Sequence, residues 1–454
     1  MRDIVKRFLS IIGVNRAIFY FLSGKGFAAI ATPITLYLIS TCLDPVTQGY
    51  YYTLASLLAI SLFFELGMGV VITQFASHEY AKLSWGKNNC LTGDIQALSR
   101  LFSILRKSLK WYAVICALFS LIAIPGGLYF LGAKSVGQDI NYIWPWIFTV
   151  ISYALGTMLI PFSSTIEGCG HVASIQKMRI IQAVCRYILS WTVMLSGGKL
   201  FVVSVEFMMA FIAFLLWLIY NYRGLLKQLF SKRTPSESQI SWGREILPMQ
   251  WRVAVSWVAM FFAGCLFIPL LFSFQGPVEA GKMGMSLRLN EIIFFVSMAW
   301  VNTRAPLFGS LVKEKNFAEL DRTVFRCTFQ AICVGLFLTF SLLVTVLILK
   351  RYAPIHASRI ISPYALFFLC LAGLCQVYTY ALGSYLRAYK KEPFMLVQIS
   401  LAVLVTASTY ITTRYFNANA VAVSYFLVLF CVGIPYSTYV FLKKRKEWSR
   451  VVVS

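Results

Sequence analysis

Four charged residues stand inside long apolar stretches of this sequence, where charge is costly. Arg288 and Glu291 lie three residues apart, and Lys25 and Glu65 occur earlier in the chain. A charge near the middle of a membrane helix costs about 2.5–3.5 kcal/mol on insertion scales, so such charges usually face a cavity or a partner. We therefore expect these four residues to line a polar path through a membrane.

The two cations, Lys25 and Arg288, suit an anionic ligand. Arginine stays charged, and its planar fork of N–H donors matches a phosphate or a carboxylate. The alternative for Arg288 is an ion pair within its own helix, because Glu291 at i+3 shares its helix face. The alternative for Lys25, which stands between Gly24 and Gly26, is a side chain that extends to the lipid headgroups. We predict that both cations bind substrate and that Glu291 orients Arg288.

Glu65 is predicted to lie in the inner half of the second membrane span. A carboxylate that is removed from water can bind and release a proton near neutral pH. Glu65 is therefore a candidate for coupling transport to an ion gradient. The alternative is that it pairs with a cation on a neighbouring helix, such as Lys25. We assign Glu65 and Glu291 to coupling or to the lining of a cavity.

Catalytic and metal chemistry find no support in the sequence. The three histidines, His78, His171 and His356, are far apart and lack the spacing of metal ligands. The eleven cysteines include no CxxC pair and fit small apolar packing residues. No P-loop is present, and no Gly-x-Ser-x-Gly motif has a plausible histidine partner. We expect no metal, no cofactor and no enzymatic activity.

Apolar stretches long enough to cross a membrane account for most of the chain. Of the 454 residues 59% are hydrophobic and only 13% are charged, against about 25% charged residues in soluble domains. A spanning helix needs about 20 mostly apolar residues, which predicts an all-α polytopic membrane protein with about twelve transmembrane helices. The predicted spans are Ala17–Cys42, Tyr50–Phe75, Trp111–Gly132, Ile143–Ile166, Ile180–Ser196, Leu200–Tyr220, Met249–Phe274, Met283–Ala305, Phe325–Leu349, Ile360–Leu386, Phe394–Thr413 and Ala420–Leu442.

The basic residues set the orientation of these spans. If the N-terminus is cytoplasmic, 31 of the 41 Lys and Arg lie in or beside the inner segments, 7 lie in outer loops and 3 lie within spans. This bias places both termini in the cytoplasm. The net charge of +24 therefore reflects orientation, and nucleic-acid binding is not expected without a basic patch on a soluble module. The sequence predicts an interfacial basic segment at the N-terminus and an aromatic interface belt at Tyr50–Tyr52.

The spans divide into two sets of six. A polar stretch at 222–248 separates an N-terminal lobe, 1–221, from a C-terminal lobe, 249–442, and a basic tail follows at 443–454. The halves look related, because Pro45, Val46 and Gly49 recur as Pro277, Val278 and Gly281 at a constant offset of 232, and Ile60 and Phe63 match residues at the same offset. Six spans per half give a parallel repeat, and such lobes commonly enclose a central cavity.

Several segments resemble the polysaccharide flippases (O-antigen, Wzx-type branch) of the multidrug/oligosaccharidyl-lipid/polysaccharide (MOP) exporter superfamily. These segments are Ser23–Leu38, Leu43–Glu79, Glu167-Gly168 and Arg304–Gly309. The resemblance implies a flippase that moves an undecaprenyl-pyrophosphate-linked oligosaccharide to the outer leaflet of a bacterial cytoplasmic membrane by alternating access. Lys25 and Arg288 then look like candidates for the cationic lining of its cavity. The implied partners are the lipid-linked oligosaccharide, membrane lipids, and possible polymerase and chain-length machinery.

Two other functions remain open at this stage. A cation- or proton-coupled multidrug or metabolite antiporter has the same architecture, although a site for cationic drugs would favour carboxylates over Lys and Arg. A membrane enzyme of glycan assembly is disfavoured, because no predicted outer loop is long enough to hold a catalytic domain. A monomer is expected, since two lobes in one chain can form the cavity alone.

Overall fold

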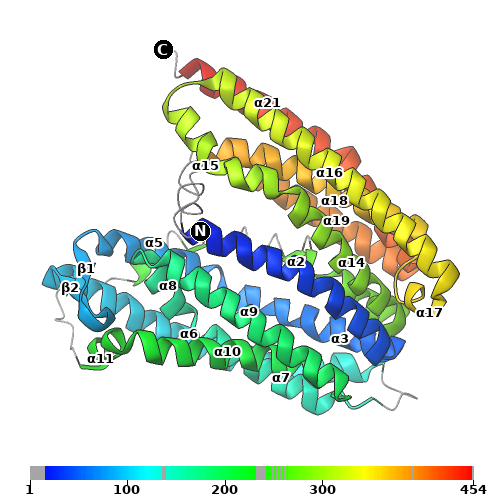
Figure 1. Ribbon diagram of the computed structural model, residues 1–454, viewed down its shortest axis with the longest axis horizontal. Coiled ribbons are helices and arrows are strands. Elements are labelled where there is room, and N and C mark those ends of the chain that lie inside the picture. The colour runs from blue at the N-terminus through cyan, green and yellow to red at the C-terminus, as the bar shows by residue number, and fades with distance from the viewer. Residues whose placement is uncertain are drawn as a thin grey trace, which may run out of the picture. The chain divides into compact units, whose positions relative to one another are not determined.

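The computed structural model folds almost entirely into helices (Figure 1). It describes residues 16–134, 140–231, 242–247, 250–251, 254, 258, 261–262, 264–389 and 393–451. Within these residues the strands form one antiparallel hairpin, β1 (Leu83–Trp85) and β2 (Leu91–Gly93). The predicted all-α polytopic fold is confirmed. The N-terminal interfacial segment lies almost wholly outside the described residues, as does the middle of the 222–248 linker, at 232–241.

Among the described residues eight helices are long and apolar enough to cross a membrane, and the number reaches ten if each of two bent helix pairs is counted as one span. Of the twelve predicted spans, the fifth is a helix, α9 (Val172–Leu195), which does not meet that test. Its basic residues Lys177, Arg179 and Arg186 lower its hydropathy. Part of the predicted seventh span lies outside the described residues, and its end is α13 (Phe267–Gln275).

The described residues fall into two compact units. The first holds the described parts of Met1–Leu43 and Leu57–Val258, and the second those of Asp44–Ser56 and Ala259–Ser454. Helix α3 (Pro45–Leu57) therefore packs with the second unit, although the sequence assigned all of the second span to the N-terminal lobe. The chain returns to the first unit through a 3-10 turn, η1 (Leu58–Ser61), and α4 (Leu62–Glu65).

The first unit is built around long apolar helices. Helix α9 packs against both α2 (Arg16–Cys42) and α10 (Phe201–Asn221). Helix α7 (Ile143–Thr157) packs between α10 and α6 (Ile95–Gly132). Helix α8 (Ile160–Gly168) packs on α5 (Met68–Tyr80). Trp146 of α7 is buried against Gly127 of α6, and its indole N–H donates to the carbonyl of Ala123 at 3.0 Å. This unit also contains the short helix α11 (Arg223–Ser231).

Aromatic stacking fixes the hairpin to the first unit. Trp85 of β1 stacks on His171 with ring centroids 4.4 Å apart, and its indole N–H donates to the carbonyl of Cys169 at 2.8 Å. His171 Nδ1 lies 2.8 Å from the Tyr222 hydroxyl. Burial lowers the pKa of His171, which favours the neutral ring in this stack.

Helix α18 (Pro363–Arg387) is the most buried span of the second unit, with 56% of its apolar window covered. It contacts α14 (Pro277–Ser297), α16 (Phe317–Tyr352), α20 (Ala418–Val428) and α21 (Ile434–Val451). The basic tail predicted from residue 443 is not separate, because α21 continues to Val451 and Trp448 packs on Tyr389. This unit also contains α15 (Ala299–Lys313), α17 (Pro354–Ala357) and α19 (Met395–Tyr415).

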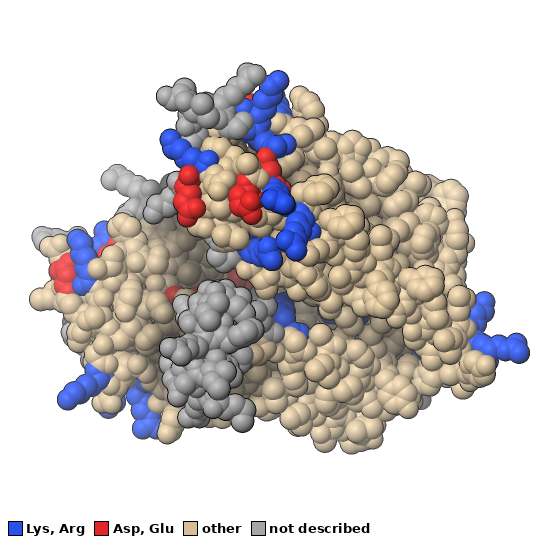
Figure 2. All heavy atoms as spheres, turned by 45° about the horizontal axis from the view of Figure 1, so that its top comes forward, with Lys and Arg blue, Asp and Glu red and all other residues tan. Residues whose placement is uncertain are grey.

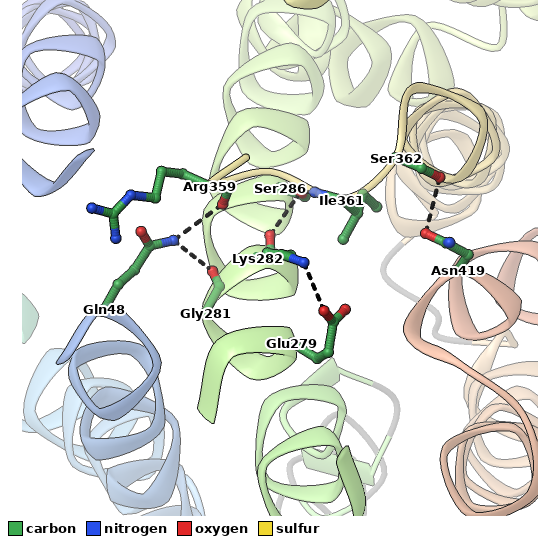
Figure 3. A network of polar contacts seen from close by, with 9 residues as sticks. All are labelled: Gln48, Glu279, Gly281, Lys282, Ser286, Arg359, Ile361, Ser362 and Asn419. Atoms are coloured by element: carbon green, nitrogen blue, oxygen red, sulfur yellow. Dashed lines mark hydrogen bonds and ion pairs between the residues drawn. The ribbon is translucent and has the colours of Figure 1, made fainter. Parts of the chain in front are cut away.

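Helices α3 and α14 meet at the two glycines that the repeat aligns. A Cβ atom built on Gly281 would lie 2.9 Å from the backbone nitrogen of Gly49, so the two backbones are almost in contact. The Gln48 side-chain amide donates to the carbonyls of Gly281 at 3.0 Å and Arg359 at 3.2 Å (Figure 3). Small residues allow such close approach between membrane helices.

The tyrosines that follow Gly49 are buried, so the predicted interface belt is wrong. Tyr50, Tyr51 and Tyr52 expose 0%, 8% and 3% of their surface. The Tyr50 ring meets Phe272 edge-on at 5.0 Å, and Tyr52 packs over Gly284. The glycine contact brings this face of α3 against α13 and α14, which removes the rings from an interface with lipid.

Both repeats bend at the same place. The pair α3–α4 and α5 bends by 48°, and the pair α14 and α15 bends by 45°. Glu65 ends the first straight part and Ser297 ends the second, and these positions are again 232 residues apart. A shared starting proline, a shared glycine and a shared bend support the internal repeat.

The exposed surface matches a lipid environment. In the view of Figure 2, charged side chains gather in separate patches, and broad areas between them are uncharged. Large apolar side chains are exposed on the spans, among them Leu121, Phe337 and Phe340 at 72%, 70% and 68%. Burial in lipid accounts for this surface, since a soluble monomer rarely exposes such large apolar patches.

We predict that Gly49→Ala destabilises the protein. The added methyl group would lie 1.9 Å from the carbonyl oxygen of Pro277, and overpacking of this kind typically costs about 1–3 kcal/mol. The measurement is the melting temperature of detergent-solubilised protein by fluorescence-detected gel filtration. Gly26→Ala is the control, because no atom lies within 4 Å of its added methyl group. Equal melting temperatures for the two variants would contradict the glycine contact.

Candidate functional site

The Arg288–Glu291 pair forms on α14 as its spacing predicts. Arg288 Nη1 donates to Glu291 Oε2 at 2.8 Å, and the two side chains are 50% and 52% exposed. Glu291 is the hydrogen-bond partner of Arg288 among the described residues, and one carboxylate oxygen occupies one of five donors. The pair therefore leaves an oriented, half-exposed guanidinium with donors available to an anion.

Asn290 lies between these residues in sequence but belongs to the buried face of α14. It is 6% exposed, and its amide oxygen has no hydrogen-bond partner among the described residues. A Cβ atom built on Gly373 of α18 would lie 2.3 Å from that oxygen. Asn290 therefore packs α14 against α18 and takes no part in the exposed pair.

Lys25 lies on an exposed part of α2. Its two flanking glycines differ in role, because Gly24 packs against Ile180 of α9 while Gly26 faces open space. Gly24 thus allows α2 and α9 to approach closely, and the exposed face carries Lys25. The structure places Lys25 within the first unit and Arg288 within the second. That the two cations share one cavity stays a prediction.

Glu65 pairs with a tyrosine instead of a cation. The Tyr112 hydroxyl of α6 donates to Glu65 Oε1 at 3.3 Å. Among the described residues no Lys or Arg forms an ion pair with Glu65, so the alternative of a Lys25 partner is wrong. No signal in the sequence pointed to Tyr112, because the two residues are 47 positions apart on different helices.

A small void adjoins Glu65. Its volume of about 10 Å³ corresponds to roughly one water molecule. Ser61, Cys116, Tyr153 and Thr157 contribute its polar lining, and the hydroxyls of Ser61 and Tyr153 lie 2.6 Å apart. Glu65 is therefore surrounded by neutral hydroxyl and thiol groups.

A larger cavity of about 290 Å³ lies inside the first unit, among α7, α8, α9 and α10. Arg179 and Gln182 supply its main polar groups, and Phe207, Phe211 and Phe214 line it with aromatic rings. Arg179 Nη2 donates to Glu167 at 3.0 Å, and Gln182 Nε2 donates to the Ala210 carbonyl at 2.7 Å. The i, i+3 spacing of Arg179 and Gln182 was the available sequence signal, and our sequence reasoning missed it.

The described residues contain no group of three or more His, Cys, Asp or Glu that could hold a metal ion. The first unit carries the exposed Lys25 and the Glu65 carboxyl group among hydroxyls, and the second carries the Arg288–Glu291 pair.

No protein-family model matches the sequence, and no curated protein matches it. Solved structures do match it. The lipid II flippase MurJ in an inward closed conformation has a TM-score of 0.65 at 12% identity, over 93% of this chain and 89% of the flippase. An inward-facing MATE-family multidrug resistance transporter of the MOP superfamily has a TM-score of 0.57 at 13% identity, over 94% of this chain and 98% of the transporter. The MATE multidrug transporter DinF-BH has a TM-score of 0.56 at 15% identity, over 93% of this chain and 95% of the transporter.

At these low identities the matches establish a shared fold. The chain shares the fold of these solved structures over nearly its whole length. These structural neighbours are transporters and a flippase. The narrower resemblance to polysaccharide flippases stays a prediction.

We predict that Gly156→Leu does not lower the melting temperature. Gly156 lines the larger cavity, and no atom lies within 4 Å of a Cβ atom built on it. Leucine fills open space there and gains up to about 1 kcal/mol of helix propensity. Gly127→Leu is the matched control, because its Cβ would lie 2.2 Å from Trp146 and should destabilise the protein. A marked loss of stability in Gly156→Leu would contradict the cavity.

Proposed function

We propose that this protein is a flippase for an oligosaccharide linked to undecaprenyl pyrophosphate, such as an O-antigen or a related surface-polysaccharide repeat unit. It moves the glycan head from the inner to the outer leaflet of a bacterial cytoplasmic membrane by alternating access. The lipid chain remains in the bilayer during this movement. The protein acts as a monomer with both termini in the cytoplasm, and it supplies substrate to polymerase and chain-length machinery.

The half-exposed guanidinium of Arg288 is the observation that carries this proposal. Arg288 follows the start of α14 at Pro277 by eleven residues, which is about 16 Å along the helix axis. A charge at that depth is expensive unless it serves a ligand or a water-filled path. A pyrophosphate offers the paired oxygens that a guanidinium binds bidentately. Glu291 holds the guanidinium in one orientation and limits its net charge between transport cycles.

Lys25 is the second cation that we assign to the substrate. An ammonium is a compact point charge on a flexible stem, so Lys25 suits a phosphate that changes position during transport. The fold shared with a lipid II flippase supports a lipid-linked substrate. Two cations on different units suit a substrate that alternating access passes from one membrane face to the other.

The second candidate is a cation- or proton-coupled multidrug or metabolite antiporter. The fold shared with MATE multidrug transporters favours it, and the Glu65 carboxyl group supplies a binding site for a cation. The exposed ammonium of Lys25 and guanidinium of Arg288 count against it, because they would repel cationic drugs. The two candidates therefore differ in the charge of their substrate.

We predict that Arg288→Ala, combined with Lys25→Ala, traps complete lipid-linked oligosaccharide in the inner leaflet. Each lost charge-assisted contact is worth about 1.5–3 kcal/mol, so we expect outward movement to slow by at least about tenfold. The measurement labels spheroplasts of a deletion strain with a membrane-impermeant glycan-modifying probe. Arg288→Lys should restore part of the activity, since it keeps the charge and loses the fork. Arg414→Ala is the control for loss of an exposed arginine.

Three outcomes separate the candidates. Complete repeat units that are trapped on deletion and released by the wild-type gene establish flipping. Release by the double variant at the wild-type rate would refute the cationic site and leave flipping intact. Normal surface glycan on deletion, with raised sensitivity to cationic dyes, would identify the antiporter instead.

A further inference from the structure

We infer that the end of the second unit at which α3, α14 and α18 begin binds a phosphate group that carries a neighbouring hydroxyl. Arg359 binds the phosphate, and Gln48 accepts a hydrogen bond from the hydroxyl. Two molecules present this chemistry, the sugar phosphate of a lipid-linked glycan and the headgroup of phosphatidylglycerol. The site rests on the proposed function only in making this the outer end of the protein and in naming the glycan as one source.

The loop between α16 and α18 is basic, although the charge bias that orients the chain disfavours basic outer loops. Three of the seven Lys and Arg that the sequence assigns to outer loops lie here, namely Lys350, Arg351 and Arg359. Lys350 and Arg351 belong to the last turn of α16, where cations stabilise the end of a helix. Arg359 lies beyond α16 and α17, so neither orientation nor a helix end accounts for it.

Hydrogen bonds from two helices hold the backbone of this loop in place. The Gln48 side-chain amide donates to the carbonyls of Arg359 and Gly281 at 3.2 Å and 3.0 Å. The backbone N–H of Ile361 donates to the hydroxyl of Ser286 at 3.2 Å (Figure 3). The side chain of Arg359 therefore extends from an anchored segment, and such preorganisation lowers the entropic cost of binding a ligand.

The guanidinium of Arg359 is buried without a partner. Arg359 is 7% exposed, and its Nη1 has no hydrogen-bond partner among the described residues. Figure 3 shows its side chain extending away from the Lys282–Glu279 ion pair, on the side of Gln48. Burial lowers the pKa of Arg359, which reflects the cost of keeping its charge out of water. A buried charge is stabilised by a hydrogen-bonded counter-charge, so this position favours a bound anion.

Asp44 attracts Arg359 electrostatically, but its carboxylate is already engaged at the start of α3. It accepts hydrogen bonds from the backbone N–H groups of Val46 at 3.0 Å and Thr47 at 2.9 Å, and from the Thr47 hydroxyl. This arrangement is an N-cap. Asp44 forms no ion pair with Arg359 in the described part of the chain, so the guanidinium keeps donors for a ligand.

Gln48 provides the complementary group. It is 1% exposed, and its amide nitrogen is occupied by two carbonyls. Its Oε1 is buried and has no partner among the described residues. An amide oxygen can only accept, so it requires a donor. A hydroxyl beside the phosphate supplies that donor, whereas a water molecule would satisfy both side chains and leave the charge of Arg359 unneutralised.

The helix ends add to the preference for an anion. Helices α3, α14 and α18 all begin at this end, and the positive ends of their dipoles favour negative charge there. Gly276, the N-cap residue of α14, makes no side-chain capping hydrogen bond. The field of these helix ends therefore acts in the same direction as the charge of Arg359.

This phosphate site is separate from the Arg288–Glu291 pair. Gly281, which shares the Gln48 amide with Arg359, precedes Arg288 by seven residues, or about 10 Å along α14. With the outward direction of the proposed function, Arg359 lies nearer the outer face than Arg288. It would then hold a phosphate that Arg288 has released.

The first test measures the melting temperature of the purified full-length protein in phosphatidylcholine nanodiscs. The probes are glucose 1-phosphate, methyl phosphate and short-chain phosphatidylglycerol. We expect stabilisation by glucose 1-phosphate or phosphatidylglycerol, with a half-maximal concentration that rises at least about tenfold in Arg359→Gln. Arg351→Gln is the matched control and should respond as the wild type does. Methyl phosphate has no hydroxyl for Gln48 and should bind about threefold to tenfold more weakly than glucose 1-phosphate.

The probes distinguish the two sources of the phosphate. Stabilisation by glucose 1-phosphate assigns the site to the glycan, and stabilisation by phosphatidylglycerol alone assigns it to the lipid headgroup. Each result supports the site if it depends on Arg359. No stabilisation by either probe, or an equal response in Arg359→Gln, would overturn the inference.

The second test uses the wild-type protein and so does not depend on the folding of a variant. Phenylglyoxal modifies arginine side chains, and peptide mass spectrometry reports the rate at each position. The probe that raises the melting temperature should slow modification of Arg359 and leave that of Arg351 unchanged. Equal rates at Arg359 with and without the probe would refute the site.

Both readouts separate this site from the proposed function. The response that depends on Arg359 should persist in Arg288→Ala, and its loss there would show that the two arginines form one site. Neither readout depends on glycan export. Failure of the spheroplast assay alone would therefore refute the flippase and leave the phosphate site intact.

Discussion

The close contact between Gly49 and Gly281 is the constraint on which much of the structure depends. It lets the first turns of α3 and α14 touch backbone to backbone, and Gln48 then reaches across to the Gly281 carbonyl. Because α3 is held in the second unit, the rest of its span must return to the first unit over a few residues. The irregular segment from Leu58 to Gly67 follows from that requirement, and Glu65 lies within it.

The charged groups of the spans are of two kinds, which differ in their polar neighbours. Arg288 and Glu291 are half exposed and neutralise each other within one helix turn, so they can remain ionised beside an anionic ligand. Glu65 has only hydroxyl and thiol groups as polar neighbours among the described residues, so its charge is the less tolerable one. The first arrangement suits binding of a charged substrate, and the second suits exchange of a proton.

Helical periodicity explains what the sequence could predict. The Arg288–Glu291 pair depends only on a spacing of three residues, and the spans depend only on apolar length, so both were accessible without a structure. The Tyr112 partner of Glu65, the cavity at Arg179 and Gln182, and the burial of Tyr50 depend on which helices pack together. Hydropathy does not specify helix neighbours, because every span is apolar. The transfer of α3 to the second unit was missed for the same reason.

The repeat shows which polar residues were added to a common scaffold. The counterpart of Glu65 in the second repeat is Ser297, and the counterparts of Arg288 and Glu291 in the first are Ser56 and Ala59. The starting prolines, the glycines and the bends are shared, whereas none of these charges is. If the charges served only to stabilise a bent span, both repeats would need them. Their restriction to one repeat each favours separate roles for the Glu65 carboxyl group in the first unit and for the Arg288–Glu291 pair in the second.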